Sequence, residues 1–274
     1  MNLHKLLLCC VVLVYCAACS SHKMRSDLLQ AMRSSVPLGR EEQSQVLVQL
    51  SEQTSKINTI KSLWRVSIEE GESRSTLRQI IVAERPRRVR MEYLPLRAAL
   101  ALQVLVLRDS DFTFLDVNAK RAYSGAVGSR TLQRLLGIPL QPEQLTALLV
   151  GRIDVDALAL RGETIGIVRD LEHGRMYLTV GDAREVYRLA STDLSLEQVE
   201  FWDPFSEELL MQVDYISYDS VKGIKVQTTI EMQLPLSDLS FLMRRSSLTL
   251  NTELKEGVFE VTIPPDYSVE SYGG

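Results

Sequence analysis

Residues 129–151 read SRTLQRLLGIPLQPEQLTALLVG and predict two short amphipathic helices in a chain that otherwise alternates like a β-sheet. Ser129 is a suitable cap for the first helix, and Gly137 is a suitable end. Pro142 suits the first position of the second helix, and Gly151 follows its last turn. Leucines recur at helical spacing in both segments: Leu132, Leu135 and Leu136, then Leu145, Leu148 and Leu149. These helices are suited to cover one face of a sheet, either as a lid or as a fixed layer of an α+β core.

Between Ile60 and Ile263, apolar and polar residues alternate in roughly ten or eleven runs with a period of two. Val226 and Leu250 fall on the apolar side of two of these runs. Strands with one wet and one dry face are typical of an antiparallel sheet. The predicted fold class is therefore mainly β (α+β), with a single strongly curved sheet whose concave apolar face is covered by the 129–151 helices. Barrels of about this number of strands commonly enclose apolar ligands.

Turn signals separate many of these runs, and no strand–helix alternation or internal repeat is present. The signals are Glu70-Gly71-Glu72, Arg85-Pro86, His173-Gly174, Gly181-Asp182 and Lys222-Gly223.

The first residues, MNLHKLLLCCVVLVYCAAC, predict a signal peptide over residues 1–18, because the apolar run is too short to span a membrane. The segment resembles a bacterial lipoprotein signal, in which cleavage leaves Cys19 as the acylated first residue. Cys16 stands where such signals usually carry leucine. The mature chain then contains no cysteine besides Cys19, so it has no internal disulfide to form. Ser20 after the anchor favours the outer membrane.

Residues 19–58 are predicted to form a polar tether that becomes helical in its second half, where Val46, Leu47 and Leu50 share one side. Residues 59–274 then form the curved-sheet domain with its lid helices at 129–151.

Residues 93–151 also resemble a known family. YLPLRAALALQVLVLRDSDFTFLDVNAKRAYSG, followed by LQRLLGIPLQPEQLTALLVG, is similar to the outer-membrane lipoprotein receptors of the LolB family. The matching features are the turn at Leu94-Pro95-Leu96, the segment ending in Tyr123, and the helix junction Gly137-Ile138-Pro139-Leu140. Leu94 and Arg97 stand where the family has Asn and Gly. The tail after Ile263 has no counterpart in the pattern.

The resemblance implies an incomplete β-barrel with a helical lid over an apolar cavity. It also implies a monomer on the periplasmic face of the outer membrane that accepts acylated lipoproteins from a LolA-like carrier and inserts them into the membrane. The cavity and lid residues would be Leu132, Leu135, Leu136, Leu145, Leu148, Leu149, Val226 and Leu250.

Pro95 interrupts strand pairing, so residues 93–100 predict a turn between two strands. Turns favour polar residues, yet this one carries Leu94, Leu96 and Leu100. Either the leucines fold back onto the core, or they contact acyl chains. In the resembled family a leucine on the matching turn hands cargo to the membrane, and Leu96 falls at that position.

The sequence shows no constellation typical of an enzyme, and no metal site or cofactor is expected. The mature histidines, His22 and His173, have no partner at ligand spacing. Asp154 and Asp156 have strand spacing and favour a solvated edge. Trp64 and Trp202 lie in strand patterns typical of a core or cavity lining.

The net charge of −4 argues against nucleic acid as a partner. The densest basic run, residues 85–90, is explained by a solvated sheet face or by attraction to an anionic membrane.

Two functions fit these observations. One is a lipid-anchored acceptor and inserter of lipoproteins. The other is a structural or adaptor lipoprotein of the envelope whose cavity is simply a filled core.

Overall fold

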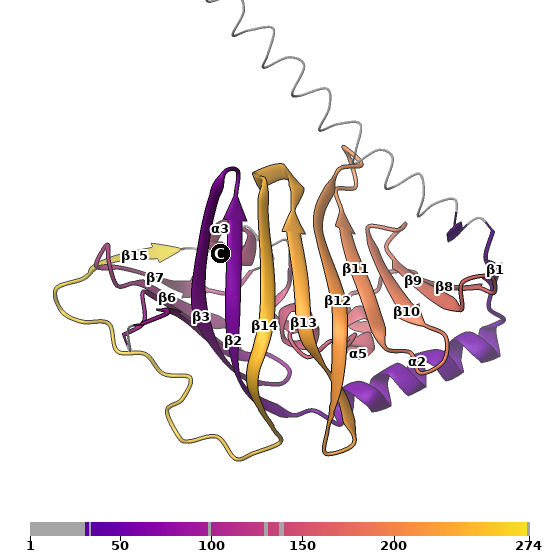
Figure 1. Ribbon diagram of the computed structural model, residues 1–274, viewed down its shortest axis with the longest axis horizontal. Helices are drawn as coiled ribbons and strands as arrows, with labels where there is room; N and C mark the ends of the chain where they lie inside the picture. The colour runs from indigo at the N-terminus through magenta and orange to yellow at the C-terminus, as the bar shows by residue number, and fades with distance from the viewer. Residues whose placement is uncertain (1–30, 33, 98–99, 129–130, 137–139, 273–274) are drawn as a thin grey trace, which may run out of the picture.

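The computed structural model describes residues 31–32, 34–97, 100–128, 131–136 and 140–272, which form a single open sheet of 15 strands (Figure 1). The strand order is β1-β8-β9-β10-β11-β12-β13-β14-β2-β3-β4-β5-β6-β7-β15. Neighbours pair antiparallel except β15, which runs parallel to β7. Because β1 and β15 remain unpaired on their outer sides, the sheet is an incomplete barrel, as predicted.

The strands are β1 Val36–Pro37, β2 Thr59–Glu70, β3 Ser73–Glu84, β4 Arg88–Pro95, β5 Gln103–Arg108, β6 Asp111–Asp116, β7 Arg121–Ala126, β8 Ile165–Asp170, β9 Arg175–Val180, β10 Glu185–Ala190, β11 Leu196–Trp202, β12 Leu209–Val221, β13 Ile224–Leu234, β14 Leu239–Leu250 and β15 Ser268–Tyr272. The helices are α2 Arg40–Ser55, α3 Thr131–Leu136, α4 Pro142–Leu148 and α5 Val155–Leu160, with a 3₁₀ turn, η1, at Pro235–Ser237.

The period-two pattern corresponds to burial on one face of the strands. In β12, Met211, Val213 and Tyr215 are all buried in the inner core, whereas Leu209, next to a register shift, belongs to the outer-face cluster. Strands β2 to β14 occupy the region where ten or eleven runs were predicted, two or three more than expected. The extra strands come from short six-residue pieces, which give a weak alternation signal. The predicted turns lie between strands, and Lys222 and Gly223 both take positive φ in the tight β12–β13 hairpin.

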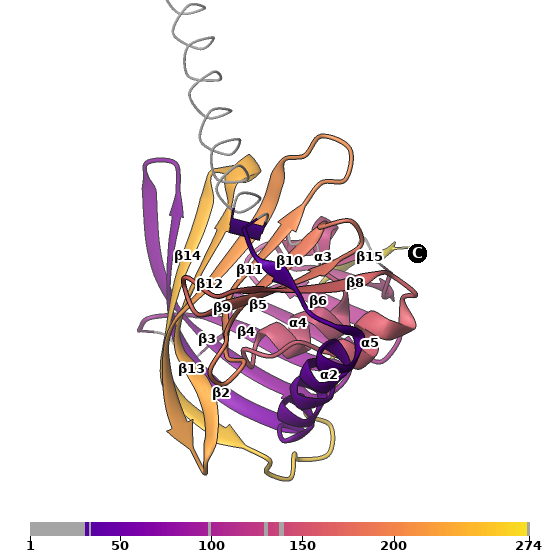
Figure 2. The ribbon, with the colours of Figure 1, turned by 90° about the vertical axis from the view of Figure 1, so that its right-hand side faces the viewer.

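The helices cover the concave side of the sheet (Figure 2). Leu132, Leu145 and Leu148 from the helices belong to one continuous core with the inner side chains of the strands. Helix α2 contributes Val46 and Leu50 to the same core, so the predicted N-terminal helix packs directly on the half-barrel.

The two chain ends cover the outer face at opposite sides of the sheet. Ala31 and Met32 pack on an apolar cluster of β9–β12 that includes Trp202, and β1 then pairs with β8. The segment after β14 packs on a second cluster through Phe259 and Leu254 before β15 pairs with β7. The tail after Ile263 therefore extends one edge of the sheet. Both terminal strands protect edges that would otherwise expose unpaired backbone groups.

The strand expected around Asp154 and Asp156 is wrong: this segment begins helix α5. Asp154 Oδ1 accepts a hydrogen bond from Ala157 N at 3.0 Å and so caps the helix. Asp154 is the N-cap of α5 and Asp156 lies in its first turn, so the two carboxylates do not share one face of a strand.

Candidate functional site: the inner face and its helical cover

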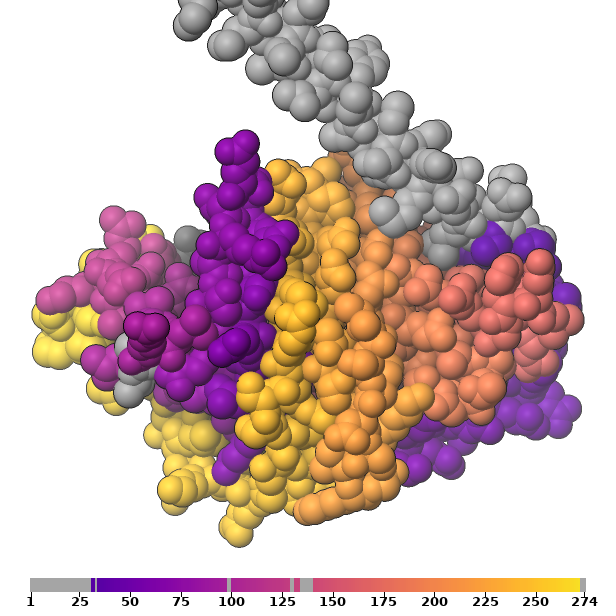
Figure 3. Space-filling view, in the orientation of Figure 1, coloured from indigo at the N-terminus to yellow at the C-terminus, as the bar shows by residue number. Residues whose placement is uncertain are grey.

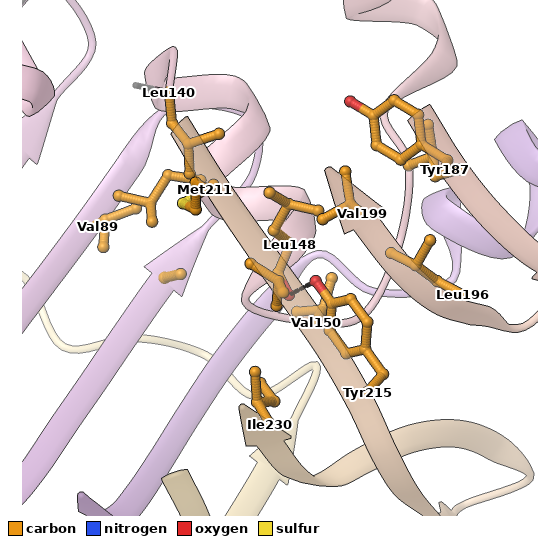
Figure 4. Close-up of a cluster of buried hydrophobic side chains, with 14 of the residues drawn as sticks. Val89, Leu140, Leu148, Val150, Tyr187, Leu196, Val199, Met211, Tyr215 and Ile230 are labelled. Carbon is orange, nitrogen blue, oxygen red and sulfur yellow. Dashed lines mark hydrogen bonds between the residues drawn. The ribbon is translucent and has the colours of Figure 1, made fainter. Parts of the chain in front are cut away.

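Most of the predicted cavity and lid residues meet on the inner face. Leu132, Leu145, Leu148, Val226 and Leu250 are all buried in the same core, and Leu149 is half-buried at its margin. Figure 4 shows Leu148 directed toward Val199 and Tyr215 of the sheet. The side chains of Leu135 and Leu136 lie outside the described part, as do Ser129 and Gly137. The structure thus brings the inner-face residues together, and their contact with lipid stays a prediction.

The C-terminal end of α4 is held to the sheet from both sides: sheet side chains donate to its carbonyls, and Arg152 donates to a strand carbonyl. Tyr215 Oη donates to Leu148 O at 2.9 Å (Figure 4). Gln227 Nε2 donates to Leu149 O, and Arg152 Nη2 donates to Lys225 O at 2.6 Å. Leu148 O also accepts from Gly151 N at 3.0 Å, so the side-chain contacts add to the turn that ends the helix and fix its position on the sheet.

A buried carboxylate fastens α4 and α5 to strand β10. Glu185 accepts two hydrogen bonds from Arg161, at 2.7 and 3.0 Å, in a bidentate pair. It also accepts from Gln144 Nε2 at 3.0 Å and from Tyr187 Oη at 2.8 Å. Burial and the neighbouring Glu185 charge raise the pKa of Tyr187 well above its usual value, so its hydroxyl remains a donor.

A second polar contact joins α2, the β3–β4 turn and α5. Arg85 Nη2 lies 3.1 Å from Asp154 Oδ2, and Arg85 Nη1 donates to Thr54 O at 2.6 Å. Thr54 Oγ1 in turn donates to Ile153 O at 2.9 Å. Arg85 is therefore part of a half-buried ion pair, which corrects its interpretation as one residue of a solvated basic run.

Sequence reasoning missed these polar contacts. The partners are separated by 24 positions in Arg161–Glu185 and by 69 in Arg85–Asp154, and no local pattern links them. The only local signal was the presence of charged residues within otherwise apolar helices.

A cavity of about 930 Å³ lies beside the helical cover, at the β3–β4 turn. Its lining includes Arg85, Arg87, Gln144, Asp154 and Arg161. Pro86, Leu158 and Leu160 add apolar surface to the same lining, so the cavity is mixed in character, and Leu148 is not among its lining residues.

The β4–β5 turn differs from expectation at one of its two predicted contact residues. Leu94 lies in β4, pairs with Arg78 of β3 and is only 6% exposed, so the expectation of an exposed Leu94 is wrong. Pro95 does end the strand, and beyond it Leu96 is 43% exposed and Leu100 81% exposed. Leu94 still pairs with β3, whereas Leu96 follows Pro95, the last residue of β4 that pairs with β3.

Other features bear on function only weakly. Within the described ranges, no group of three or more His, Cys, Asp or Glu side chains is arranged to hold a metal ion. His173 Nδ1 lies 2.9 Å from Asp170 Oδ2 at the β8–β9 turn. Trp64 and Trp202 are buried, as their strand patterns predicted. Of the helices described, none is both long and apolar enough to cross a membrane.

Three solved structures share this architecture. A DUF1329 family protein from Desulfovibrio piger matches with a TM-score of 0.55 and 15% identity, over 79% of this chain and 95% of that protein. A LolA superfamily protein from Nitrosomonas europaea matches with a TM-score of 0.52 and 13% identity, over 78% of this chain and 97% of that protein. A Vibrio parahaemolyticus domain named for outer-membrane lipoprotein sorting matches with a TM-score of 0.55 and 13% identity, over 78% of this chain and 95% of that domain.

This chain shares the fold of these three proteins. At these identities the likeness establishes the fold alone, and it does not distinguish a LolB-like receptor from other proteins of this architecture. No family model matches the sequence, and no curated protein sequence matches it.

Proposed function

We propose that this chain is a lipid-anchored envelope protein that binds the acyl chains of lipoproteins on its inner face and inserts the lipoproteins into the outer membrane. The observation that carries the proposal is an apolar half-barrel face covered by separate short helices. The same architecture occurs in a domain named for lipoprotein sorting. In this proposal Cys19 carries the anchor, Leu96 leads delivery, and a LolA-like carrier supplies cargo to the monomer. No catalytic step or cofactor is required.

The energetics favour partial rather than complete enclosure of the cargo. Burying each CH₂ group contributes about 0.8 kcal/mol, so wrapping three acyl chains completely would prevent their release. An open half-barrel covers the chains incompletely, and transfer can then run downhill into the bilayer.

Access to the inner face requires α4 to move away from the sheet. Its end is held by hydrogen bonds such as Tyr215–Leu148, and the net contribution of each such bond is about 1 kcal/mol because water replaces it on opening. Lifting α4 also uncovers Leu145 and Leu148, whose burial contributes roughly 1.5–3 kcal/mol each, so acyl chains must replace these apolar contacts as the cover opens.

The direct test is binding of a fluorescent triacylated lipopeptide to the chain of residues 20–274. We expect saturable binding that is competed by unlabelled lipopeptide, followed by transfer to phospholipid vesicles. The same peptide without acyl chains is the matched control and should not bind. A folded protein that ignores both peptides would contradict the proposal.

The alternative, a structural or adaptor lipoprotein, is favoured by one observation: the inner face is closed by packed side chains around Leu148. A protein of that kind purifies without lipid and does not take up a hydrophobic dye. Lipid extraction and dye titration of the purified chain therefore separate the two functions.

The proposed anchor has its own test. Cys19→Ser should give a chain that no longer labels with palmitate in cells and is uncleaved or released. Unchanged palmitate labelling would show that Cys19 is not the anchor.

A further inference from the structure

Exposed apolar side chains gather along one rim of the sheet. In an antiparallel sheet alternate turns lie at the same end, so the turns after β4, β11 and β13 share a rim with the β2–β3 turn. We call this the apolar rim; it comprises turn residues 71–72, 96–97, 100–102, 203–208 and 235–238. Besides Leu96 and Leu100, it carries Phe205 at 94% exposure and Leu236 at 60%. Figure 3 shows the β2–β3 and β13–β14 ends projecting along this rim.

The turn that carries Phe205 is held in a defined conformation. Asp203 Oδ1 accepts hydrogen bonds from the backbone N–H groups of Phe205 and Ser206, both at 2.8 Å. These two donors lower the pKa of Asp203, so the carboxylate stays ionised and keeps the turn closed. Phe205 thus projects from a preformed turn, where it buries almost no surface within its own chain.

Leu236 is presented in a similar way. It lies in η1 between Pro235 and Ser237, and Asp238 closes this turn in the left-handed conformation. Gly71 N donates to Asp238 O at 3.2 Å, which links the turn to the neighbouring β2–β3 hairpin. An ordered apolar tip loses little conformational entropy on binding, so such a tip is suited to contact another apolar phase.

The N-terminal segment packs on the outer-face cluster that reaches this rim. Ala31 and Met32 contact the cluster of Tyr177, Val186, Trp202 and Leu209, of which Trp202 and Leu209 flank the Phe205 turn, and β1 then pairs with the end of β8. Cys19 precedes Ala31 by 12 positions, and that length of chain spans at most about 40 Å when fully extended. An acylated Cys19 therefore keeps Ala31, and with it the cluster that includes Trp202, within about 40 Å of the bilayer.

We propose that the apolar rim is a membrane-contact surface, in which Phe205 and Leu236 enter the interfacial region of the bilayer that holds the anchor. The inference rests on the proposed function only in requiring an acylated Cys19. Acidic residues surround the Phe205 and Leu236 tips, namely Asp203, Glu207, Glu208 and Asp238, whereas Arg97 is exposed beside Leu96. Contact is therefore apolar rather than electrostatic, and the surface prefers zwitterionic over anionic lipid.

The chain supplies a clean way to test this. Residues 20–274 contain no cysteine, and they include every described strand and helix. Single variants Phe205→Cys and Leu236→Cys can therefore carry an environment-sensitive fluorophore. Leu171→Cys is the matched control, because Leu171 is 73% exposed on the β8–β9 turn at the opposite rim. With phosphatidylcholine vesicles, we expect a blue shift at 205 and 236 and none at 171. An equal response at all three sites, or none at 205 and 236, would overturn the proposal.

Vesicle flotation gives a second readout without labels. Phe205→Asp should lower the partition coefficient of the 20–274 chain roughly tenfold or more, while Leu171→Asp leaves it unchanged. Adding phosphatidylglycerol should weaken binding, and salt should restore it. Binding that strengthens with phosphatidylglycerol would assign the contact to basic residues and overturn the proposal.

The outcome is separable from that of the lipopeptide assay. A chain that binds vesicles through Phe205 but ignores triacylated peptide refutes the transfer function and leaves the rim intact. A chain that binds the triacylated peptide but shows no fluorescence shift at position 205 with vesicles supports the transfer function and refutes the membrane-contact role of the rim.

Discussion

The two faces of the sheet are both partly apolar, but they are covered in different ways. The inner face forms one continuous core beneath helices α3, α4 and α5, whereas the outer face carries two smaller clusters beneath the chain ends. The inner cover is fastened by polar contacts, such as Tyr215 to Leu148 O and Arg161 to Glu185. The outer cover adds strands β1 and β15 to the edges of the sheet.

This difference separates a removable cover from a permanent one. Hydrogen bonds between side chains and helix carbonyls are exchanged for water at little net cost. Removing a terminal strand exposes the unpaired backbone of β7 or β8 and uncovers an apolar cluster as well. In the proposed function the inner cover is the one that opens, with acyl chains replacing the apolar contacts that it gives up.

The largest expected effect tests whether the inner cover is separable. Leu148→Glu places a carboxylate among the side chains of the core, and we expect it to lower the free energy of unfolding by roughly 2–4 kcal/mol and to abolish dye binding. Because α4 can lift off, the sheet should still melt cooperatively. Leu160→Glu, on the neighbouring helix but 88% exposed, is the control and should change neither quantity. Loss of the cooperative melt in urea would favour a single fixed core.

The next effect concerns a titrating group on the outer face. Glu200 is 3% exposed, and burial raises its pKa from 4.5 to about 7, although Trp202 Nε1 donates to it at 3.1 Å. The folded state then holds the proton more tightly than the unfolded state. This contribution to stability is fully present below pH 4.5 and is lost as the pH rises through 7.

Glu200→Gln should therefore flatten the dependence of stability on pH and raise the free energy of unfolding at pH 8 by roughly 1–3 kcal/mol. Urea unfolding at pH 5 and pH 8 measures both. The exposed Glu208→Gln is the control and should leave the slope as it is. If the slope survives in Glu200→Gln, another group is responsible for it.

The sequence alone was sufficient to predict the sheet and helix α4, but not helix α5 or the burial of Leu94. The period-two runs and the turn pairs such as Lys222-Gly223 were sufficient for the sheet, because alternation and turn chemistry are local. Pro142 likewise marked the start of α4. The helix α5 was missed, because its capping residue Asp154 also fits an alternating pattern. The burial of Leu94 depends on its pairing with Arg78, which is a long-range property.

The candidate site divides in the same way. The leucine stripe of α4 was readable from helical spacing, and its residues do reach the core. The contacts that hold the cover, such as Arg161 with Glu185, join residues from separate elements. No local sequence pattern around either residue indicates its partner.

A smaller effect tests the fastening of the cover. Tyr215→Phe removes the donor to Leu148 O and should lower the free energy of unfolding by about 1 kcal/mol while speeding the uptake of a hydrophobic dye. Tyr177→Phe changes a buried tyrosine of the outer-face cluster and should leave the dye kinetics unchanged. Stopped-flow fluorescence provides the rates. Equal acceleration in both variants would mean that dye enters by general loosening rather than by movement of α4.

The smallest effect on stability is expected at a residue that belongs to neither face. Leu96 lies beyond the last pair of β4 and is 43% exposed, so Leu96→Glu should change the free energy of unfolding by less than about 0.5 kcal/mol. Delivery is a different matter, because a charge at the tip disfavours its entry into hydrocarbon by roughly 2–4 kcal/mol. Anchoring and lipopeptide binding should persist, while transfer from the protein to liposomes should stop. Leu160→Glu, on α5 and more exposed at 88%, controls for the added charge. Transfer by Leu96→Glu at the parent rate would exclude this turn as the insertion device and leave delivery to Phe205 and Leu236 on the same rim.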